Sequence, residues 1–174
     1  MAKALLVVAQ DKYKDKEYLD TKAALEDNEI EVRTAAKTKD KAKGVDGGEV
    51  DPDFALADVR LDEFDAVVFI GGEGSAQYFD DQEAQKILKT AAKDGKIVAA
   101  ICIAPKLLAN VGLLKGIRAT SFPSVKEDLI SAGADFTGEP VESEGHIFTA
   151  NGPDAAEEFG EKIAFTLMSE AIGE

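Results

Sequence analysis

The stretch that decides the fold reads Gly95-Lys96-Ile97-Val98-Ala99-Ala100-Ile101-Cys102, followed by Ile103-Ala104-Pro105. Its apolar run predicts a buried strand, and Pro105 suits the first turn of a helix. Small residues stand two positions before and two positions after Cys102, where a sharp strand-to-helix turn leaves no room for large side chains. The pattern predicts an α/β enzyme's nucleophile elbow, with Cys102 at its centre.

Two interpretations of Cys102 remain open at this point. At the start of a helix, free N–H groups and the helix dipole would favour a thiolate and lower the thiol pKa below about 8.5. A free cysteine is also often a buried, inert hydrophobe. The residue pattern alone does not choose between them.

Working outward from Cys102, apolar runs alternate with segments of helical spacing. Strands are predicted at 4–9, 30–35, 66–70, 97–101, 118–122 and 144–150. Helices are predicted at 19–26, from a capping signal at 80–83 to Ala92, at 105–109, 125–132 and 155–171. Turn signals between 37 and 62 predict a hairpin or excursion. We therefore expect one doubly wound, flavodoxin-like α/β domain over residues 1–174, with a mostly parallel sheet sandwiched between helices.

In such a sheet, ligands bind beyond the carboxyl ends of the strands. Three loops are expected there: the loop after Ala9, the loop at Gly71-Gly72, and the turn at Cys102. The sequence thus predicts a site in which these loops meet.

The composition limits the partners and the cofactors. With 34 acidic against 20 basic residues, the formal net charge is −14, which disfavours nucleic acid and anionic membranes. The single cysteine forms no intrachain disulfide, and no apolar run approaches the length of a membrane span, so we expect a cytoplasmic protein. One cysteine and one histidine do not make a zinc site, so we expect neither metal nor cofactor.

The chain resembles the ThiJ/PfpI superfamily, which includes PfpI-type intracellular proteases and deglycase-like proteins and has a class I glutamine amidotransferase-like fold. The resemblance covers nearly the whole chain. Its most specific element is the Ala-x-Cys elbow, 30 residues after Gly-Gly. The segments that carry it are 64–72, 95–102 with Pro105, 112–116, 119–123 and 126–134.

This resemblance implies roles for four residues. Cys102 would be the reactive cysteine, and Glu17 would be the glutamate whose carboxyl group touches the thiol. The backbone N–H groups of Gly72 and Ile103 would form an oxyanion hole. Without the resemblance, Glu17 is one acid among several in a charged stretch, and Gly-Gly after a strand is ordinary turn chemistry.

The sequence also departs from the family pattern. PfpI-type proteases carry a histidine directly after the cysteine, where this chain has Ile103, and Ala76 stands where a neighbouring subunit's acid is expected. Phe122 replaces a histidine of the deglycase branch, and Asn151 replaces an arginine. The only histidine, His146, is a weak candidate for a general base. Peptidase activity is therefore doubtful.

The favoured function is that of a stress-response hydrolase or lyase for small carbonyl compounds or glycated protein, like family glyoxalases and deglycases. Cys102 would be its nucleophile and Glu17 its proton shuttle. The alternatives are a redox sensor or chaperone that acts through oxidation of Cys102, and a pseudoenzyme with an inert cysteine. The resemblance further implies a homodimer or a higher homo-oligomer.

Overall fold

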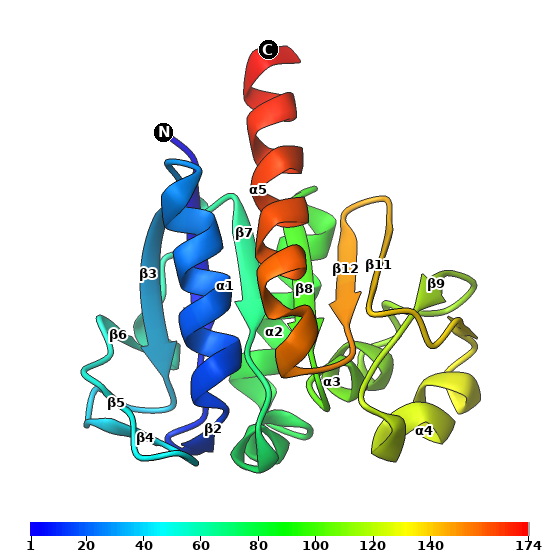
Figure 1. The fold of residues 1–174 in the computed structure, drawn as a ribbon, viewed down its shortest axis with the longest axis horizontal. Coiled ribbons are helices and arrows are strands. Elements are labelled where there is room, and N and C mark those ends of the chain that lie inside the picture. The colour runs from blue at the N-terminus through cyan, green and yellow to red at the C-terminus, as the bar shows by residue number, and fades with distance from the viewer. Residues whose placement is uncertain (174) are drawn as a thin grey trace.

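The computed structural model describes residues 1–173 and is built around a seven-stranded sheet (Figure 1). The strand order is β11-β12-β8-β7-β1-β3-β6, and only β11 and β12 pair antiparallel. The carboxyl ends of the parallel strands therefore share one edge. The strands are β1 (Lys3–Val7), β3 (Glu31–Ala36), β6 (Phe54–Ala55), β7 (Ala66–Phe69), β8 (Ile97–Ile101), β11 (Val141–Glu144) and β12 (Ile147–Ala150).

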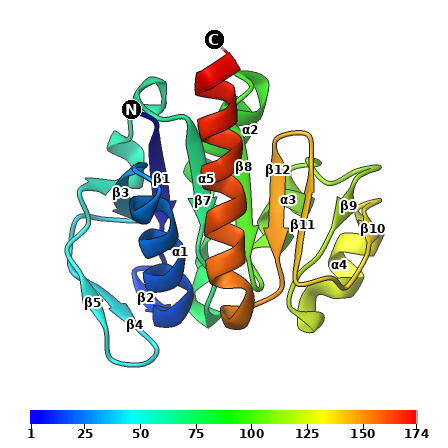
Figure 2. The same ribbon diagram turned by 45° about the horizontal axis from the view of Figure 1, so that its top comes forward.

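Helices cover both faces of this sheet. In Figures 1 and 2, α1 and α5 lie side by side on one face, and α2 and α3 lie on the other. The helices are α1 (Asp15–Asp27), α2 (Gln82–Lys93), α3 (Pro105–Asn110), α4 (Lys126–Ser131) and α5 (Ala156–Gly173). The predicted α/β fold with a mostly parallel sheet between helices is confirmed.

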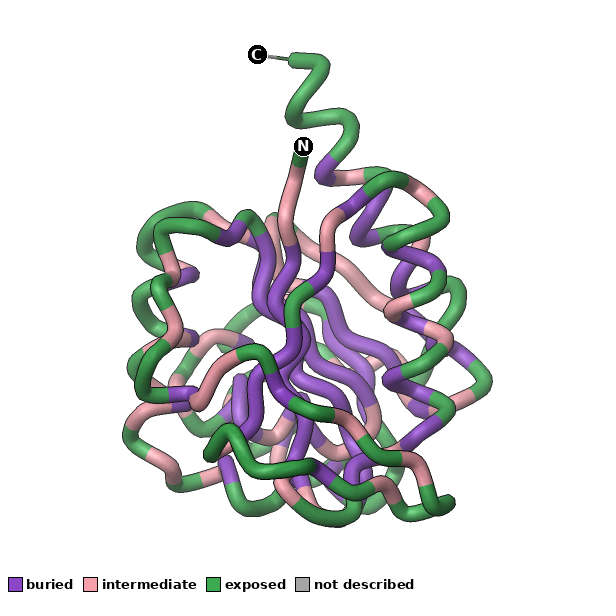
Figure 3. The backbone as a smooth tube through the Cα atoms, turned by 90° about the vertical axis from the view of Figure 1, so that its left-hand side faces the viewer, coloured by how far each residue is buried: buried purple, intermediate pink, exposed green. Residues whose placement is uncertain are grey.

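The core explains why the strands are apolar throughout. Along β1, Leu6 packs into the cluster beneath α1 and α5, whereas Leu5 and Val7 pack into the cluster on the opposite face. Figure 3 shows the buried strands between helices whose outer surfaces are exposed. A strand that is buried on both faces has no side facing solvent, so its residues do not alternate between apolar and polar.

Helix α1 begins four residues earlier than predicted. Its first turn carries the acidic residues Asp15 and Glu17, which favour the positive end of the helix dipole. Against α5 the helix lies so close that a Cβ added to Gly160 would be 2.8 Å from Ala24 Cβ. This close packing holds α1, and with it Glu17, against the sheet.

Two other predicted elements differ from the structure. The strand predicted at 144–150 is a hairpin, because Gly145 adopts a φ of 60° and turns the chain between β11 and β12. Of the strand predicted at 118–122, only β9 (Arg118–Ala119) forms, beside β10 (Asp135–Phe136).

The hairpin or excursion predicted at 37–62 is confirmed. It contains β4 (Ala42–Gly44) paired antiparallel with β5 (Glu49–Val50), and β2 (Asp11–Tyr13) lies parallel to β4. Among the helices described over residues 1–173, none combines the length and the apolar character required to cross a membrane.

Candidate functional site

Cys102 lies at the carboxyl end of β8, in a turn that leads into α3. Its φ of 67° is in the left-handed region, which a side chain with a Cβ adopts only under strain. Two backbone bonds hold it there: its N–H donates to the Ala150 carbonyl (3.0 Å), and its carbonyl accepts from the N–H of Phe122 (2.8 Å). Pro105 stands at the start of α3, as the sequence predicts.

Glu17 approaches this turn from α1 and has no exposed surface. Its Oε1 accepts a hydrogen bond from the backbone N–H of Gly71 (2.9 Å). Its Oε2 is also buried and makes no hydrogen bond of standard geometry with any residue that the structure describes. A carboxyl group with one fixed oxygen and one free oxygen is suited to gain and lose a proton.

Glu17 and Cys102 both lie against Gly71. A Cβ added to this glycine would lie 2.5 Å from Cys102 Cβ and 2.6 Å from Glu17 Oε1. The next residue, Gly72, has a φ of 101°, and a Cβ there would lie 2.5 Å from the backbone nitrogen of Lys14. Two glycines after β7 are therefore required sterically, and the missing side chain of Gly71 leaves the space in which Cys102 and the Glu17 carboxyl group approach each other.

Burial raises the pKa of Glu17 from its ordinary value of 4.5 to about 7. The Gly71 N–H, the Cys102 thiol and the charge of Lys14 oppose this shift, in that order, but do not cancel it. The Glu17 carboxyl group therefore changes its protonation near neutral pH.

The pKa of Cys102 is raised to about 12, which is opposite to the direction expected from the sequence. Burial is the largest cause, and the negative charge of Glu17 is the next. The backbone N–H groups of Gly72 and Ile103 act on the sulfur and lower the pKa, but by less. The thiol is desolvated more strongly than its place at the start of a helix suggests, and a carboxylate lies beside it. Both effects raise the thiol pKa.

A cavity of about 500 Å³ opens above the sulfur. It brings together all four residues that the family resemblance singled out. The polar part of its lining is Lys14, Glu17, Gly72, Glu73, Cys102 and Ser124, and the apolar part is Val45, Ile103, Phe122 and Pro153.

Val45 was not expected at this site. It lies in the β4–β5 turn, which is built around the buried carboxylate of Asp15. That carboxylate accepts hydrogen bonds from the N–H groups of Asp46 (2.8 Å) and Gly48 (2.7 Å). The Gly47-Gly48 turn signal was visible in the sequence, but the carboxylate that organises the turn lies more than 30 residues earlier.

His146 lies away from Cys102. It occupies the turn before β12, and its carbonyl accepts from the N–H of Val98 near the start of β8. Four residues along the strand, about 13 Å, separate Val98 from Cys102. His146 instead pairs with Glu170 of α5 (2.5 Å), so it is not part of the cysteine site.

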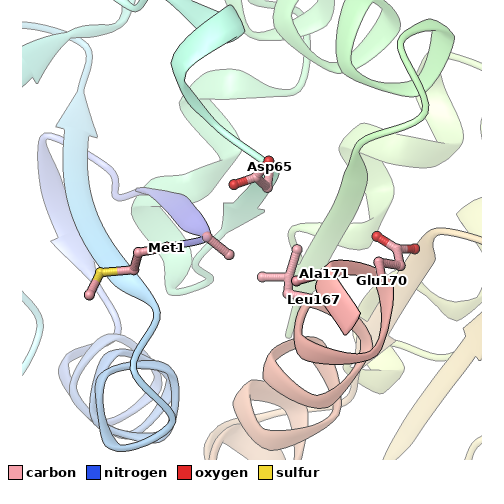
Figure 4. Close-up of a pocket in the computed structure, with 6 residues that line it drawn as sticks. Met1, Asp65, Leu167, Glu170 and Ala171 are labelled. Atoms are coloured by element: carbon pink, nitrogen blue, oxygen red, sulfur yellow. The ribbon is translucent and has the colours of Figure 1, made fainter. Parts of the chain in front are cut away.

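A second hollow, of about 220 Å³, lies at this opposite end of the sheet (Figure 4). Met1, Asp65, Leu167 and Glu170 line it, and it contains none of the residues expected to be catalytic. Over residues 1–173, no three His, Cys, Asp or Glu side chains are grouped so that they could hold a metal ion.

The site combines a sharp turn at Cys102 with a buried glutamate beside it. A family model matches residues 2–165 of the chain. The chain belongs to the DJ-1/PfpI family. Among solved structures, it resembles a ThiJ/PfpI domain protein from Brachyspira murdochii with a TM-score of 0.93. The two are 30% identical, and the match covers 96% of each chain.

Two relatives in the DJ-1/PfpI family carry functional names. A protein of Pyrococcus abyssi named a deglycase is 33% identical over 149 residues, which are 86% of this chain and 90% of the relative. A protein of Caenorhabditis elegans named a glutathione-independent glyoxalase is 29% identical over 164 residues, which are 94% and 88% of the two chains.

Proposed function

We propose that this protein is a glyoxalase or deglycase that acts on small carbonyl compounds or on their protein adducts. Cys102 is the nucleophile, and Glu17 is the proton shuttle. One observation carries the proposal: a buried carboxyl group with a pKa of about 7 lies beside the only cysteine, against Gly71 and next to a cavity. The names of the two relatives support the same substrate class.

The raised thiol pKa defines the first step. At neutral pH the sulfur is protonated, and Glu17 is partly ionised, so nucleophilic attack requires the thiol proton to move to the carboxylate. Once the proton has moved, the Glu17 charge that opposes thiolate formation is gone. Glu17 and Cys102 therefore titrate as a pair, and the reactive form has a thiolate beside a neutral carboxyl group.

For a 2-oxoaldehyde, the thiolate attacks the aldehyde carbon, and the Glu17 proton moves to the resulting alkoxide to give a hemithioacetal. Glu17 then removes the hydrogen from this carbon and returns a proton to the adjacent carbon, while the hydroxyl proton of the first carbon moves to the neighbouring ketone oxygen, which leaves a 2-hydroxy thioester. Water hydrolyses the thioester, releasing a 2-hydroxy acid and restoring the thiol. One carbon is oxidised and its neighbour is reduced, so the net change is the addition of one water.

The N–H groups of Gly72 and Ile103 are proposed to stabilise the alkoxide. They already act on the sulfur, and an oxygen bonded to the carbon beside it would lie in the same region. Removal of one such donor typically lowers kcat by about 100-fold to 1,000-fold. Because both donors belong to the backbone, replacing a histidine with Ile103 leaves this function intact.

Two other functions are less well supported. A peptidase would need a general base beside the cysteine, and Ile103 occupies that position. A redox sensor would need a thiol that ionises readily, because the thiolate is the form that reacts with peroxide, and the pKa of Cys102 is raised. The homodimer expected from the family resemblance stays a prediction, which sedimentation equilibrium would test.

The test is the conversion of methylglyoxal to lactate by the wild-type protein and by Cys102→Ser. Wild type should consume methylglyoxal and form an equal amount of lactate, and Cys102→Ser should fall to the uncatalysed rate. Equal rates in the two proteins, or no lactate from either, would overturn the proposal. Circular dichroism of both proteins would check that the substitution leaves the fold intact.

A further inference from the structure

We propose that the apolar wall of the cavity selects 2-oxoaldehydes that carry an aromatic or branched apolar substituent over methylglyoxal. Phe122, Ile103 and Val45 are the specificity-determining residues. This inference rests on the proposed function and adds the substrate class. Ile103 and Phe122 stand where the family pattern has histidines, and Val45 comes from the β4–β5 turn.

The three side chains come from separate segments and meet at one cavity. Phe122 is 43% exposed and Val45 is 44% exposed, and both line the same space as Cys102. Single exposed apolar residues are ordinary, but several around a concave site form the apolar lining that ligand pockets commonly have. An apolar group on the substrate would cover this surface.

The backbone fixes Phe122 relative to the nucleophile. Its N–H donates to the Cys102 carbonyl (2.8 Å), and its carbonyl accepts from the N–H of Val125 (3.1 Å). Its ring passes beside Gly152, where an added Cβ would lie 4.0 Å from Phe122 Cδ1. The phenyl ring thus lines the same cavity as Cys102, where a substituent on the attacked carbonyl would lie.

Val45 closes the other side of the cavity. Its N–H donates to the carbonyl of Tyr13 (2.9 Å), and the rest of its turn is bound to the Asp15 carboxylate. Lys14 adds an ion pair with Asp46 of the same turn (3.2 Å). These bonds hold the β4–β5 turn in place, so the Val45 side chain has a defined position in the cavity lining.

The charges around the cavity favour a neutral substituent. Lys14 is the only cation in the described lining, and Asp46 already pairs with it. Glu73 adds negative charge, and none of the chain's arginines is in the described lining. A substrate substituent that carries a carboxylate would therefore meet no unpaired cationic side chain in the described lining.

The experiment compares phenylglyoxal with methylglyoxal as substrates. For each variant, the ratio of the two kcat/KM values is measured, so that the intrinsic reactivities of the aldehydes cancel between variants. Wild type should favour phenylglyoxal, and Phe122→Ala should lower the ratio by about tenfold, the discrimination expected for small changes in an apolar pocket. Phe165→Ala, on the exposed surface of α5, is the matched control and should keep the wild-type ratio.

The outcomes separate this inference from the proposed function. A Phe122→Ala ratio equal to that of wild type, with both proteins active, would overturn the inference and leave the proposed function standing. A complete lack of turnover would overturn the proposed function. Binding would then decide the inference, measured by ligand-observed NMR with the neutral product analogues mandelamide and lactamide. Tighter binding of mandelamide that Phe122→Ala removes would support the apolar selection, and equal binding of the two amides would overturn it.

Discussion

The two ends of the sheet both carry a hollow and ionisable side chains, but they differ in how those side chains are solvated. At the carboxyl end, Glu17 is fully buried beside Cys102, and its pKa is raised to about 7. At the opposite end, His146 and Glu170 form a hydrogen-bonded pair whose side chains are 41% and 44% exposed. Water screens that pair, whereas the protein replaces water around Glu17.

This difference shows that neither a cavity nor a histidine is enough to mark a reactive site. The end without a histidine contains the desolvated, coupled pair of Glu17 and Cys102, and the end with the histidine contains an exposed hydrogen-bonded pair. We therefore expect substitutions at the carboxyl end to affect chemistry, and substitutions at the opposite end to affect stability only slightly.

The largest effect should come from Gly71→Ala. The new methyl group would overlap Cys102 Cβ and Glu17 Oε1, so the turn and the carboxyl group must move apart. Because a misplacement of about 1 Å can lower a rate about 100-fold, we expect at least that loss in methylglyoxal turnover, with about 1–3 kcal/mol of destabilisation from overpacking. Steady-state kinetics and urea unfolding would measure the two effects.

Gly95→Ala is the control for Gly71→Ala. Gly95 precedes β8 at the opposite end, with a φ of +75° and nothing within 4 Å of an added Cβ. We expect about 1 kcal/mol of strain and unchanged turnover. Wild-type turnover in Gly71→Ala would show that the separation of Cys102 and Glu17 is unimportant.

Glu17→Gln should remove the proton shuttle and lower turnover by about 100-fold or more. It should also change how stability depends on pH. Because the folded state holds the Glu17 proton more tightly than the unfolded state, wild type should lose stability relative to Glu17→Gln as the pH rises from about 4.5 to about 7. The shift corresponds to about 3 kcal/mol, and the difference between the two proteins should be constant above that range.

Urea unfolding at several pH values between 4.5 and 8 would measure this difference. Gln82→Ala, at an exposed position on α2, removes no titratable group and should differ from wild type by an amount that does not change with pH. Parallel stability curves for wild type and Glu17→Gln would mean that the pKa of Glu17 is ordinary.

Asp15→Asn should have an intermediate effect, because it weakens two hydrogen bonds between a buried carboxylate and the β4–β5 turn. We expect about 2 kcal/mol of destabilisation and a smaller preference for phenylglyoxal, since Val45 would be held less firmly. Urea unfolding and the kcat/KM ratio would measure these effects. Asp20→Asn, which breaks a surface ion pair on the same helix, should lower stability by about 0.5 kcal/mol and leave the ratio unchanged.

The smallest effect should come from His146→Gln. The substitution weakens an exposed side-chain contact with Glu170, so we expect a loss of less than about 1 kcal/mol and wild-type turnover. Thermal unfolding and methylglyoxal kinetics would measure both. A tenfold loss of turnover would mean that the opposite end of the sheet takes part in the reaction.

Much of the architecture could be predicted from short segments. The apolar run 97–101 with its small flanking residues predicted β8, the turn at Cys102 and the helix that begins at Pro105, and each is present. The strand 144–150 was predicted wrongly because Gly145 adopts a turn conformation inside an otherwise strand-like pattern. Local patterns predict strands that are buried on both faces better than they predict hairpins at a sheet edge.

The site was less predictable than the fold. The positions of Cys102 and Gly72 followed from the ends of β8 and β7, but Glu17 came only from the family resemblance. Val45 was missed entirely, because a carboxylate 31 residues before Asp46 positions the turn in which it lies. Contacts that join distant segments leave no periodic pattern in the chain.

The sequence by itself determined the order of strands and helices, the turn at Cys102 and the pair of glycines after β7, because each depends on backbone geometry and on nearby apolar residues. Only the tertiary structure decided that the thiol pKa rises, that the Glu17 pKa reaches about 7, and that His146 lies at the other end of the sheet. The reason is that a pKa depends on the water and charge around a group, and packing between distant segments sets both.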